Sequence, residues 1–382
     1  AERTAVFAGA TQALFVLASV LRERGARRIA VEDPGHRWRT RALEAAGIEI
    51  VPAPVGELPG DVDAVVVSPD HQFPTGTRLA PERRRALVAW AREGRLVVEH
   101  DHDGHFRYDR PPVGALQALA PEHVAYVGSA SALLAPAVRL GWAVLPMSLV
   151  VPVANRLFAT GLGTSRLAQL TLAQLVARGS LDRHLRRANT AYRRRRLLAV
   201  TQLPRRLPGS VTGGAASGLF LHVALPEDAD EAALLASARA RGIALDGVGE
   251  HALTPQPPGL VVGFAALPEP SLERALRALG RAADPTEVAA ARARLESMEE
   301  RVVDNEGLHR YELWLGERFA GWTDYRRANG ETWLLHVEVE PDLRGEGYAD
   351  RFMREIVADL DRRGETPKPV CSYAAAWLRR NR

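Results

Sequence analysis

Histidines and aspartates gather in one short run of the sequence. His100 and His102 are two residues apart, on or just after an apolar run that predicts a strand, so both side chains are expected on one side. With His36 and the adjacent Asp101 and Asp103 they would form a cluster of imidazoles and carboxylates. Such groups bind zinc, iron, nickel or copper. His100, His102 and His36 are therefore candidate metal ligands, and the alternative is a disused pocket with polar replacements.

A glycine-bearing loop near the C-terminus is suited to holding a pyrophosphate. It lies between a predicted strand and a predicted helix, where free backbone N–H groups cup phosphates and glycine permits close approach. The loop contains, in order, Arg344, Gly345, Gly347 and Tyr348.

The strand before that loop carries two candidate bases. His336 and Glu338 are two residues apart and share one face, where either could accept a proton from an amine. Alternatively, His336 is only a packed strand residue. Cys371 is a third catalytic candidate, and its alternative role is that of a small buried hydrophobic residue.

A further anion site is expected near the start of the chain. The segment Gly9–Thr11 opens a predicted helix, whose free N–H groups suit a phosphate.

The elements that would position these residues alternate along the first 150 positions. Short apolar runs are separated by segments with helical periodicity, which implies βαβ units and a mostly parallel sheet covered on both faces. The predicted strands are Ile29–Glu32, Ile48–Val51, Ala64–Ser68, Leu96–Glu99, Val124–Val127 and Gly141–Leu145. The predicted helices are Thr11–Arg24, Arg37–Ala46, Pro81–Glu93 and Pro112–Leu119.

The rest of the chain predicts a smaller lobe and a second domain. Residues 1–283 are expected to form one α/β domain, with a large lobe over about 1–155 and a small α+β lobe over about 190–283. A helical stretch, Leu167–Leu198, lies between the lobes. Residues 284–302 predict a linker helix, and residues 303–382 a second domain with a strand at Thr332–Val339 and a helix at Ala349–Arg363.

Composition limits the chemistry and the location. The 382 residues include 50 Lys+Arg and 46 Asp+Glu, and this small excess of charge does not argue for nucleic-acid binding. The only lysine is Lys368, and the single cysteine excludes an internal disulfide and a cysteine-based zinc cluster. The longest apolar stretches, Ala5–Leu21 and Trp142–Ala154, are interrupted and too short to span a membrane, and we expect no signal peptide. A cytoplasmic location is expected.

Several motifs in residues 4–282 resemble the fold-type I aminotransferases, and most closely the aminotransferase-like domain of MocR-type transcription regulators. The motifs are Val31–His36 (VEDPGH), Ser68–Gly76 (SPDHQFPTG), Glu99–Tyr108 (EHDHDGHFRY) and Tyr126–Arg139 (YVGSASALLAPAVR). The resemblance implies a homodimer and a pyridoxal phosphate (PLP) pocket, with Thr11, Ser129, Ser131 and Arg139 as the phosphate cup.

The departures from that family concern the cofactor ring. The lysine that holds PLP as an imine corresponds to Ala132, the aspartate facing the pyridine nitrogen to His100, and the tyrosine facing the ring hydroxyl to His102. An imine needs an amine, so transamination by the usual mechanism is excluded. The alternatives are that the domain binds PLP or another phosphorylated ligand without a covalent link, and that the cup is a remnant.

Residues 303–382 resemble short N-acyltransferases of the GCN5-related (GNAT) superfamily. The motifs are His336–Ala349 (HVEVEPDLRGEGYA) and Pro369–Tyr373 (PVCSY). The resemblance implies that Arg344, Gly345, Gly347 and Tyr348 hold acetyl-CoA.

These observations lead to a main hypothesis and two alternatives. The main one is an acetyl-CoA-dependent N-acetyltransferase of an unknown amine, whose aminotransferase-fold domain serves as a ligand-binding and dimerisation scaffold. One alternative is a non-catalytic MocR-like ligand sensor, a fragment of a transcription regulator. The other is a metal-dependent enzyme in the histidine pocket. The basic run Arg183–Arg196 is interpreted as a solvated helix face, so nucleic acid would be contacted only through residues outside this chain.

Overall fold

The computed structural model describes residues 2–58, 60–109, 114–161, 163–297, 300–340, 343 and 347–381. Its contacts divide the chain into two compact units. The first comprises residues 1–231 and 238–283, and the second comprises residues 284–382 with the short segment 232–237.

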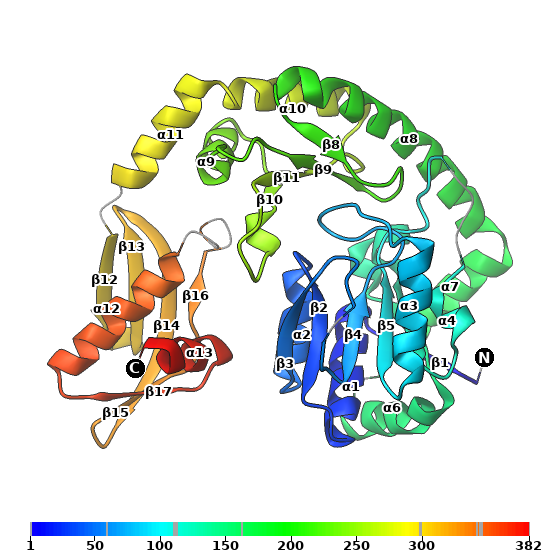
Figure 1. Ribbon diagram of the computed structural model, residues 1–382, viewed down its shortest axis with the longest axis horizontal. Coiled ribbons are helices and arrows are strands. Elements are labelled where there is room, and N and C mark those ends of the chain that lie inside the picture. The colour runs from blue at the N-terminus through cyan, green and yellow to red at the C-terminus, as the bar shows by residue number, and fades with distance from the viewer. Residues whose placement is uncertain are drawn as a thin grey trace. The chain divides into compact units, whose positions relative to one another are not determined.

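The first unit is built on a seven-stranded sheet with the order β1-β7-β6-β5-β4-β2-β3 (Figure 1). Strands β2 to β6 pair in parallel where they are neighbours, and β7 runs antiparallel to both β6 and β1. The strands are β1 Thr4–Phe7, β2 Arg28–Asp33, β3 Glu49–Pro54, β4 Ala64–Val67, β5 Leu96–Asp101, β6 Val124–Ser129 and β7 Gly141–Val144.

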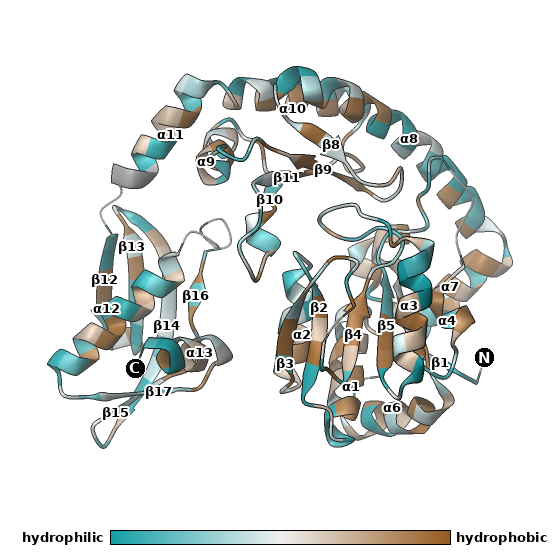
Figure 2. Cartoon of the chain, viewed as in Figure 1, coloured by the Kyte–Doolittle hydropathy of each residue, from teal (hydrophilic) through white to brown (hydrophobic). Residues whose placement is uncertain are grey.

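Helices cover both faces of this sheet because alternate strand residues point to opposite sides. Ala64 and Val66 pack toward one face, and Val65 and Val67 pack toward the other. Figure 2 shows β4 and β5 mostly in apolar colours. The first face is covered by α1 Ala10–Glu23, α2 Arg37–Ala45 and α6 Met147–Ala159, and the second by α3 Pro81–Arg92 and α4 Leu116–Leu119.

The small lobe of the first unit is a four-stranded antiparallel sheet in the order β10-β11-β9-β8. Its strands are β8 Val211–Gly213, β9 Phe220–Ala224, β10 Asp246–Gly247 and β11 Gly259–Gly263. Its helices are α8 Ser180–Arg206, α9 Glu231–Ala240 and α10 Glu269–Ala282, and α7 Arg166–Ala177 precedes them. Short segments also include α5 Ala130–Leu133 and the 3-10 turns η1 Pro136–Val138 and η2 Gly249–His251.

The second unit is a curved antiparallel sheet, closed at one edge by a parallel strand, with α12 against its apolar face. Its order is β12-β13-β14-β15-β17, with β16 paired to β14. Phe352, Met353 and Ile356 of α12 are fully buried against Tyr311 and Leu313. The elements are α11 Pro285–Ser297, β12 Glu300–Asn305, η3 Glu306–Leu308, β13 Arg310–Leu315, β14 Arg318–Ala328, β15 Glu331–Leu334, β16 Glu338–Val339, α12 Tyr348–Arg362, β17 Thr366–Pro369 and α13 Ser372–Asn381.

The structure differs from the predicted elements in several places. The linker helix ends at Ser297, and β12 begins at Glu300 because Val302 pairs with Leu313 and joins the core of the second unit. The predicted stretch Leu167–Leu198 is two helices, separated at Gly179, which has φ 60°. Strand β1 had no predicted counterpart, and the predicted strand Thr332–Val339 is divided into β15 and β16. None of the helices in the described segments combines the length and apolarity that a membrane span requires.

Candidate functional site

The candidate site of the first unit is centred on a buried histidine. His100 lies near the end of β5, is fully buried, and neither of its ring nitrogens has a hydrogen-bond partner among the described residues. The ring of Trp38 lies edge-on to it, with 5.3 Å between centroids. His36 stacks on Phe73 at 3.9 Å and 3°, and its Nε2 is likewise buried without a partner. Three side chains from separate segments thus surround polar atoms that a bound molecule could contact.

Burial keeps these imidazoles neutral. Desolvation, helped by the nearby Arg39 guanidinium, lowers the pKa of both His36 and His100 well below the ordinary value. Glu32 faces Arg39 across 3.7 Å, and burial raises the pKa of Glu32 to about 7. A neutral imidazole at position 100 can donate or accept one hydrogen bond, whereas a carboxylate there would hold a protonated pyridine nitrogen.

The phosphate cup is assembled by three segments that the sheet brings together. Gly9, with φ 102°, precedes α1, and no side chain caps that helix start. A Cβ atom built on Gly9 would lie 3.9 Å from Nη1 of Arg139. Ser131 donates its backbone N–H to Oγ of Ser129 at 3.1 Å, and the two hydroxyl oxygens are 3.0 Å apart. Thr11 is exposed in the first turn of α1.

These residues fit a phosphate and do not fit an imine-bound PLP. Ala132 lies in α5, directly after the serine pair, and offers no amine. The only lysine, Lys368, belongs to the second unit and pairs with Glu331 at 3.1 Å. The structure thus brings the hydroxyls of Ser129 and Ser131 together and places Arg139 beside Gly9, while Ala132 offers no amine.

A cavity of about 290 Å³ opens beside the histidines and is lined by Asp101, which the sequence analysis placed in the candidate cluster, and by Asp70 and Glu99, which it did not select. Asp101 accepts a hydrogen bond from the Tyr126 hydroxyl at 2.9 Å, and Asp70 pairs with Arg107 at 2.6 Å. Glu99 accepts the N–H groups of Leu116 and Gln117, and burial raises its pKa to about 7. The position of Glu99 directly before the selected residues His100 and Asp101 was the available signal for it.

The three candidate metal-ligating histidines are close but do not converge on one point. Their ring centroids are separated by 5.2 Å (His36–His102), 6.0 Å (His100–His102) and 6.3 Å (His36–His100). In the described segments, the group of potential ligands whose atoms lie within 4.8 Å of one another is instead Asp246, Glu250 and His251.

The second unit carries its described candidate residues at the start of α12 and on or next to β16 and α13. Arg344 and Gly345 lie outside the described residues. Gly347 has φ 77° and caps α12, whose first residue, Tyr348, is buried. His336 Nε2 is 3.6 Å from an oxygen of Asp324.

The other two catalytic candidates lie on separate elements of that unit. Glu338 is on β16, opposite Trp322. Cys371 precedes α13 and its sulfur accepts the N–H of Ala374 at 3.3 Å. The thiol therefore acts as a cap of that helix in this structure.

Comparison with known proteins identifies both units. Residues 1–279 match the family model of class I and II aminotransferases, and residues 310–382 match the model of GCN5-related N-acetyl-transferases. Both resemblances found in the sequence are thereby confirmed.

Two curated relatives are transcription regulators. The chain is 31% identical over 283 residues to the HTH-type pyridoxine biosynthesis transcriptional regulator PdxR of Corynebacterium glutamicum, covering 71% of this chain and 61% of the regulator. It is 27% identical over 290 residues to the probable rhizopine catabolism regulatory protein MocR of Rhizobium meliloti, covering 73% and 59%. The chain thus spans less than two thirds of the length of these curated relatives.

A solved structure confirms the predicted fold class. The first unit resembles LysN, an α-aminoadipate aminotransferase from Thermus thermophilus complexed with N-(5'-phosphopyridoxyl)-L-leucine. The TM-score is 0.66 at 24% identity, covering 76% of this chain and 78% of that one.

Proposed function

The chain belongs to the class I and II aminotransferase family, and on that premise we propose that residues 1–283 sense a small phosphorylated ligand as part of a transcription regulator. This reverses the order of the hypotheses drawn from the sequence, because the curated relatives are regulators. In this proposal the first unit binds its ligand reversibly, performs no transamination and works in the cytoplasm.

The observation that carries the proposal is a retained phosphate cup beside buried, unpartnered imidazoles. Leaving a buried polar group without a hydrogen bond costs about 1–3 kcal/mol. A heteroaromatic ligand whose phosphate contacts Arg139 and Ser131 would place its ring groups near His100 and His36 and offset that cost. With Ala132 in place of an amine, such a ligand remains free to dissociate, as an effector must.

Titration with PLP and with pyridoxamine phosphate tests the proposal. We expect saturable binding of at least one of them, without the visible absorbance of an imine and without fixation by borohydride. Arg139→Ala and Ser131→Ala should each weaken binding at least tenfold. Arg83→Ala, an exposed arginine on α3, is the matched control and should leave it unchanged. A borohydride-stable adduct, or no binding of either vitamer at millimolar concentration, would contradict the proposal.

We assign DNA contacts to residues outside this chain, because arginines of the basic run on α8 contact groups of the protein itself. Arg195 donates to the carbonyl of Ala265, and it and Arg194 lie within 3.9 Å of Glu269. Arg195 thus anchors α8 to the segment that leads into α10, whereas the Arg194 side chain is 69% exposed.

A second function is favoured by the family match of residues 310–382. We propose that this unit binds acetyl-CoA, with the pyrophosphate at the start of α12. In the proposal His336, Glu338 and Cys371 are the candidates for receiving the proton of the acyl acceptor. Such a transfer needs only an amine positioned against the thioester and a group that accepts the proton of the amine. A small number of residues can supply both.

Calorimetric titration with acetyl-CoA checks this second function. We expect binding in the micromolar range that Arg344→Glu weakens at least tenfold. Arg362→Glu reverses a charge at the opposite end of α12, where its exposed ion pair with Asp359 contributes little, and should leave binding unchanged. Absence of binding to the unaltered chain would leave only the sensing function.

A further inference from the structure

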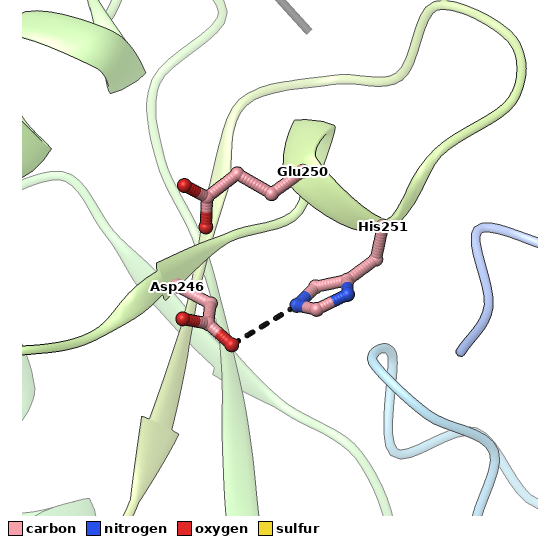
Figure 3. Close-up of side chains that lie close together, drawn as sticks. All are labelled: Asp246, Glu250 and His251. Carbon is pink, nitrogen blue, oxygen red and sulfur yellow. Dashed lines mark hydrogen bonds and ion pairs between the residues drawn. The ribbon is translucent and has the colours of Figure 1, made fainter. Parts of the chain in front are cut away.

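Three potential metal ligands converge where β10 ends. Asp246 lies on β10, and Glu250 and His251 lie in the turn η2 that follows. Nε2 of His251 is 3.2 Å from an oxygen of Asp246, and one ligand atom from each residue lies within 4.8 Å of the others. Figure 3 shows the Asp246 carboxylate meeting the imidazole, with the Glu250 side chain extending along the same side of the turn.

The backbone around the three residues is held by hydrogen bonds from several directions. Asp246 pairs with Val261 across the sheet, and Glu250 accepts the N–H of Gly247 at 3.1 Å. Glu231 fixes the turn by accepting the N–H groups of Gly249 at 3.0 Å and Gly259 at 2.7 Å. The arrangement is therefore preorganised, so little chain ordering would accompany ion binding.

The donor set has a definite chemical preference. One imidazole nitrogen with two carboxylate oxygens suits zinc and its borderline divalent neighbours better than magnesium or calcium, which take oxygen ligands. The side chain of Asp246 is 59% exposed whereas that of His251 is 16% exposed. An ion can thus enter from the solvent side and keep water in its remaining positions.

The charges around the site also favour a cation. Asp246 and Glu250 place two carboxylates beside His251, and the Arg239 guanidinium acts on both carboxylates. Two carboxylates held close together repel each other, and a divalent ion between them turns that repulsion into attraction.

We infer that Asp246, Glu250 and His251 form a binding site for one zinc-class divalent cation. This site is separate from the candidate histidine cluster at His36, His100 and His102, and it does not depend on the ligand-sensing proposal. The His251 ring lies 4.6 Å from the Phe73 ring, which stacks on His36. An ion held by His251 would therefore also restrain the side of the pocket where His36 lies.

Zinc titration of the full chain, after treatment with a chelator and dialysis, tests the inference. Competition with a chromophoric chelator should give one zinc ion per chain at this site. Replacing zinc by cobalt should give a visible spectrum with a nitrogen ligand. His251→Gln and Asp246→Asn should each weaken zinc binding at least tenfold.

Matched variants separate this site from general effects. His309→Gln removes an exposed imidazole of the second unit, and Asp228→Asn removes an exposed carboxylate of the same lobe, so both should bind as the unaltered chain does. Circular dichroism and thermal unfolding in chelator should show that His251→Gln and Asp246→Asn fold normally, because their side chains reach solvent.

Three results would overturn the inference. The first is the absence of zinc binding up to several hundred micromolar. The second is unchanged affinity in both His251→Gln and Asp246→Asn. The third is loss of the bound ion in His100→Ala/His102→Ala with retention in His251→Gln, which would assign the ion to the histidine pocket.

Discussion

At the scale of single residues, the pocket of the first unit has uncharged side chains at two positions where the family it resembles has a lysine and an aspartate. Ala132 leaves no amine for an aldehyde, and His100 presents a neutral ring because full burial disfavours its protonated form. In the sensing function that we propose, such a site recognises a ligand by its hydrogen-bonding groups and does not stabilise a developing carbanion. The two positions lie near the end of β5 and in α5, the short helix that follows β6.

The titration of Glu99 gives a prediction at this scale. Its pKa is about 7 in the folded chain because of burial, against 4.5 for an exposed glutamate. Between those values the folded state keeps a proton that the unfolded state has released. The free energy of unfolding therefore falls as pH rises through this window, by up to about 1.4 kcal/mol per pH unit. We expect Glu99→Gln to show a smaller fall than the unaltered chain when urea unfolding is measured from pH 5 to 8.

The comparison between the unaltered chain and Glu99→Gln isolates the contribution of Glu99 to the pH dependence of the free energy of unfolding. Glu32 adds a fall of the same sign, whereas His36 and His100 act in the opposite direction below pH 6.5 because their pKa values are lowered. These groups are present in both proteins and cancel in the difference. Parallel pH profiles would show that Glu99 does not titrate in this window.

At the scale of elements, the loop after β2 and the segment after η2 are joined by one buried carboxylate. Asp33 is 5% exposed and accepts the N–H groups of Leu253 at 2.7 Å and Thr254 at 2.9 Å. Gly35 also donates its N–H to the carbonyl of His251 at 2.9 Å. These contacts tie the small lobe to the loop that carries His36.

Asp33→Asn should loosen this junction. The amide group of asparagine cannot accept where its NH₂ faces a backbone N–H, so at least one buried donor loses its partner. We expect a loss of about 1–3 kcal/mol in the free energy of unfolding. Hydrogen exchange should become faster at the amides of Leu253 and Thr254. Asp228→Asn is the exposed control, and unaltered protection in Asp33→Asn would refute the role of this carboxylate.

At the scale of the whole molecule, exposed apolar side chains on α6 and α7 lead us to predict a homodimer. Four of them are at least 64% exposed: Val151, Phe158, Leu167 and Leu170. Contiguous exposed apolar surface commonly marks an interface. Fold-type I proteins, which the first unit resembles, are expected to pair in this way.

Light scattering after size exclusion should therefore give twice the chain mass of 41.6 kDa. The double variant Phe158→Asp/Leu167→Asp should shift the protein toward monomer. Leu308→Asp alters a leucine of the second unit that is 58% exposed, and it should leave the mass unchanged. A monomeric mass for the unaltered chain would contradict the prediction.

The sequence by itself determined that the first unit has a mostly parallel sheet covered on both faces, and that it contains no lysine. The run Ala64–Val67 is apolar at every position and is buried at every position, as a parallel strand covered on both faces requires. The single lysine at 368 predicted, before any geometry was known, that residues 1–283 form no internal imine. Strand β1 was missed because, unlike the equally short β4, it begins with a polar residue, Thr4, and buries only Phe7.

Only the tertiary structure decided how the sites are completed. Asp33 accepts a hydrogen bond from Thr254, which is 221 positions away in the sequence. Glu32 forms an ion pair with Arg39, a contact that the strand and helix periodicities do not predict. The neutral state of His100 depends on complete burial, which comes from Trp38 on another element. Asp246, Glu250 and His251 are near neighbours in sequence, yet they converge only because β11 and Glu231 fix the intervening turn. Periodicity records which residues are buried, whereas a site depends on which distant segments the folded chain brings together.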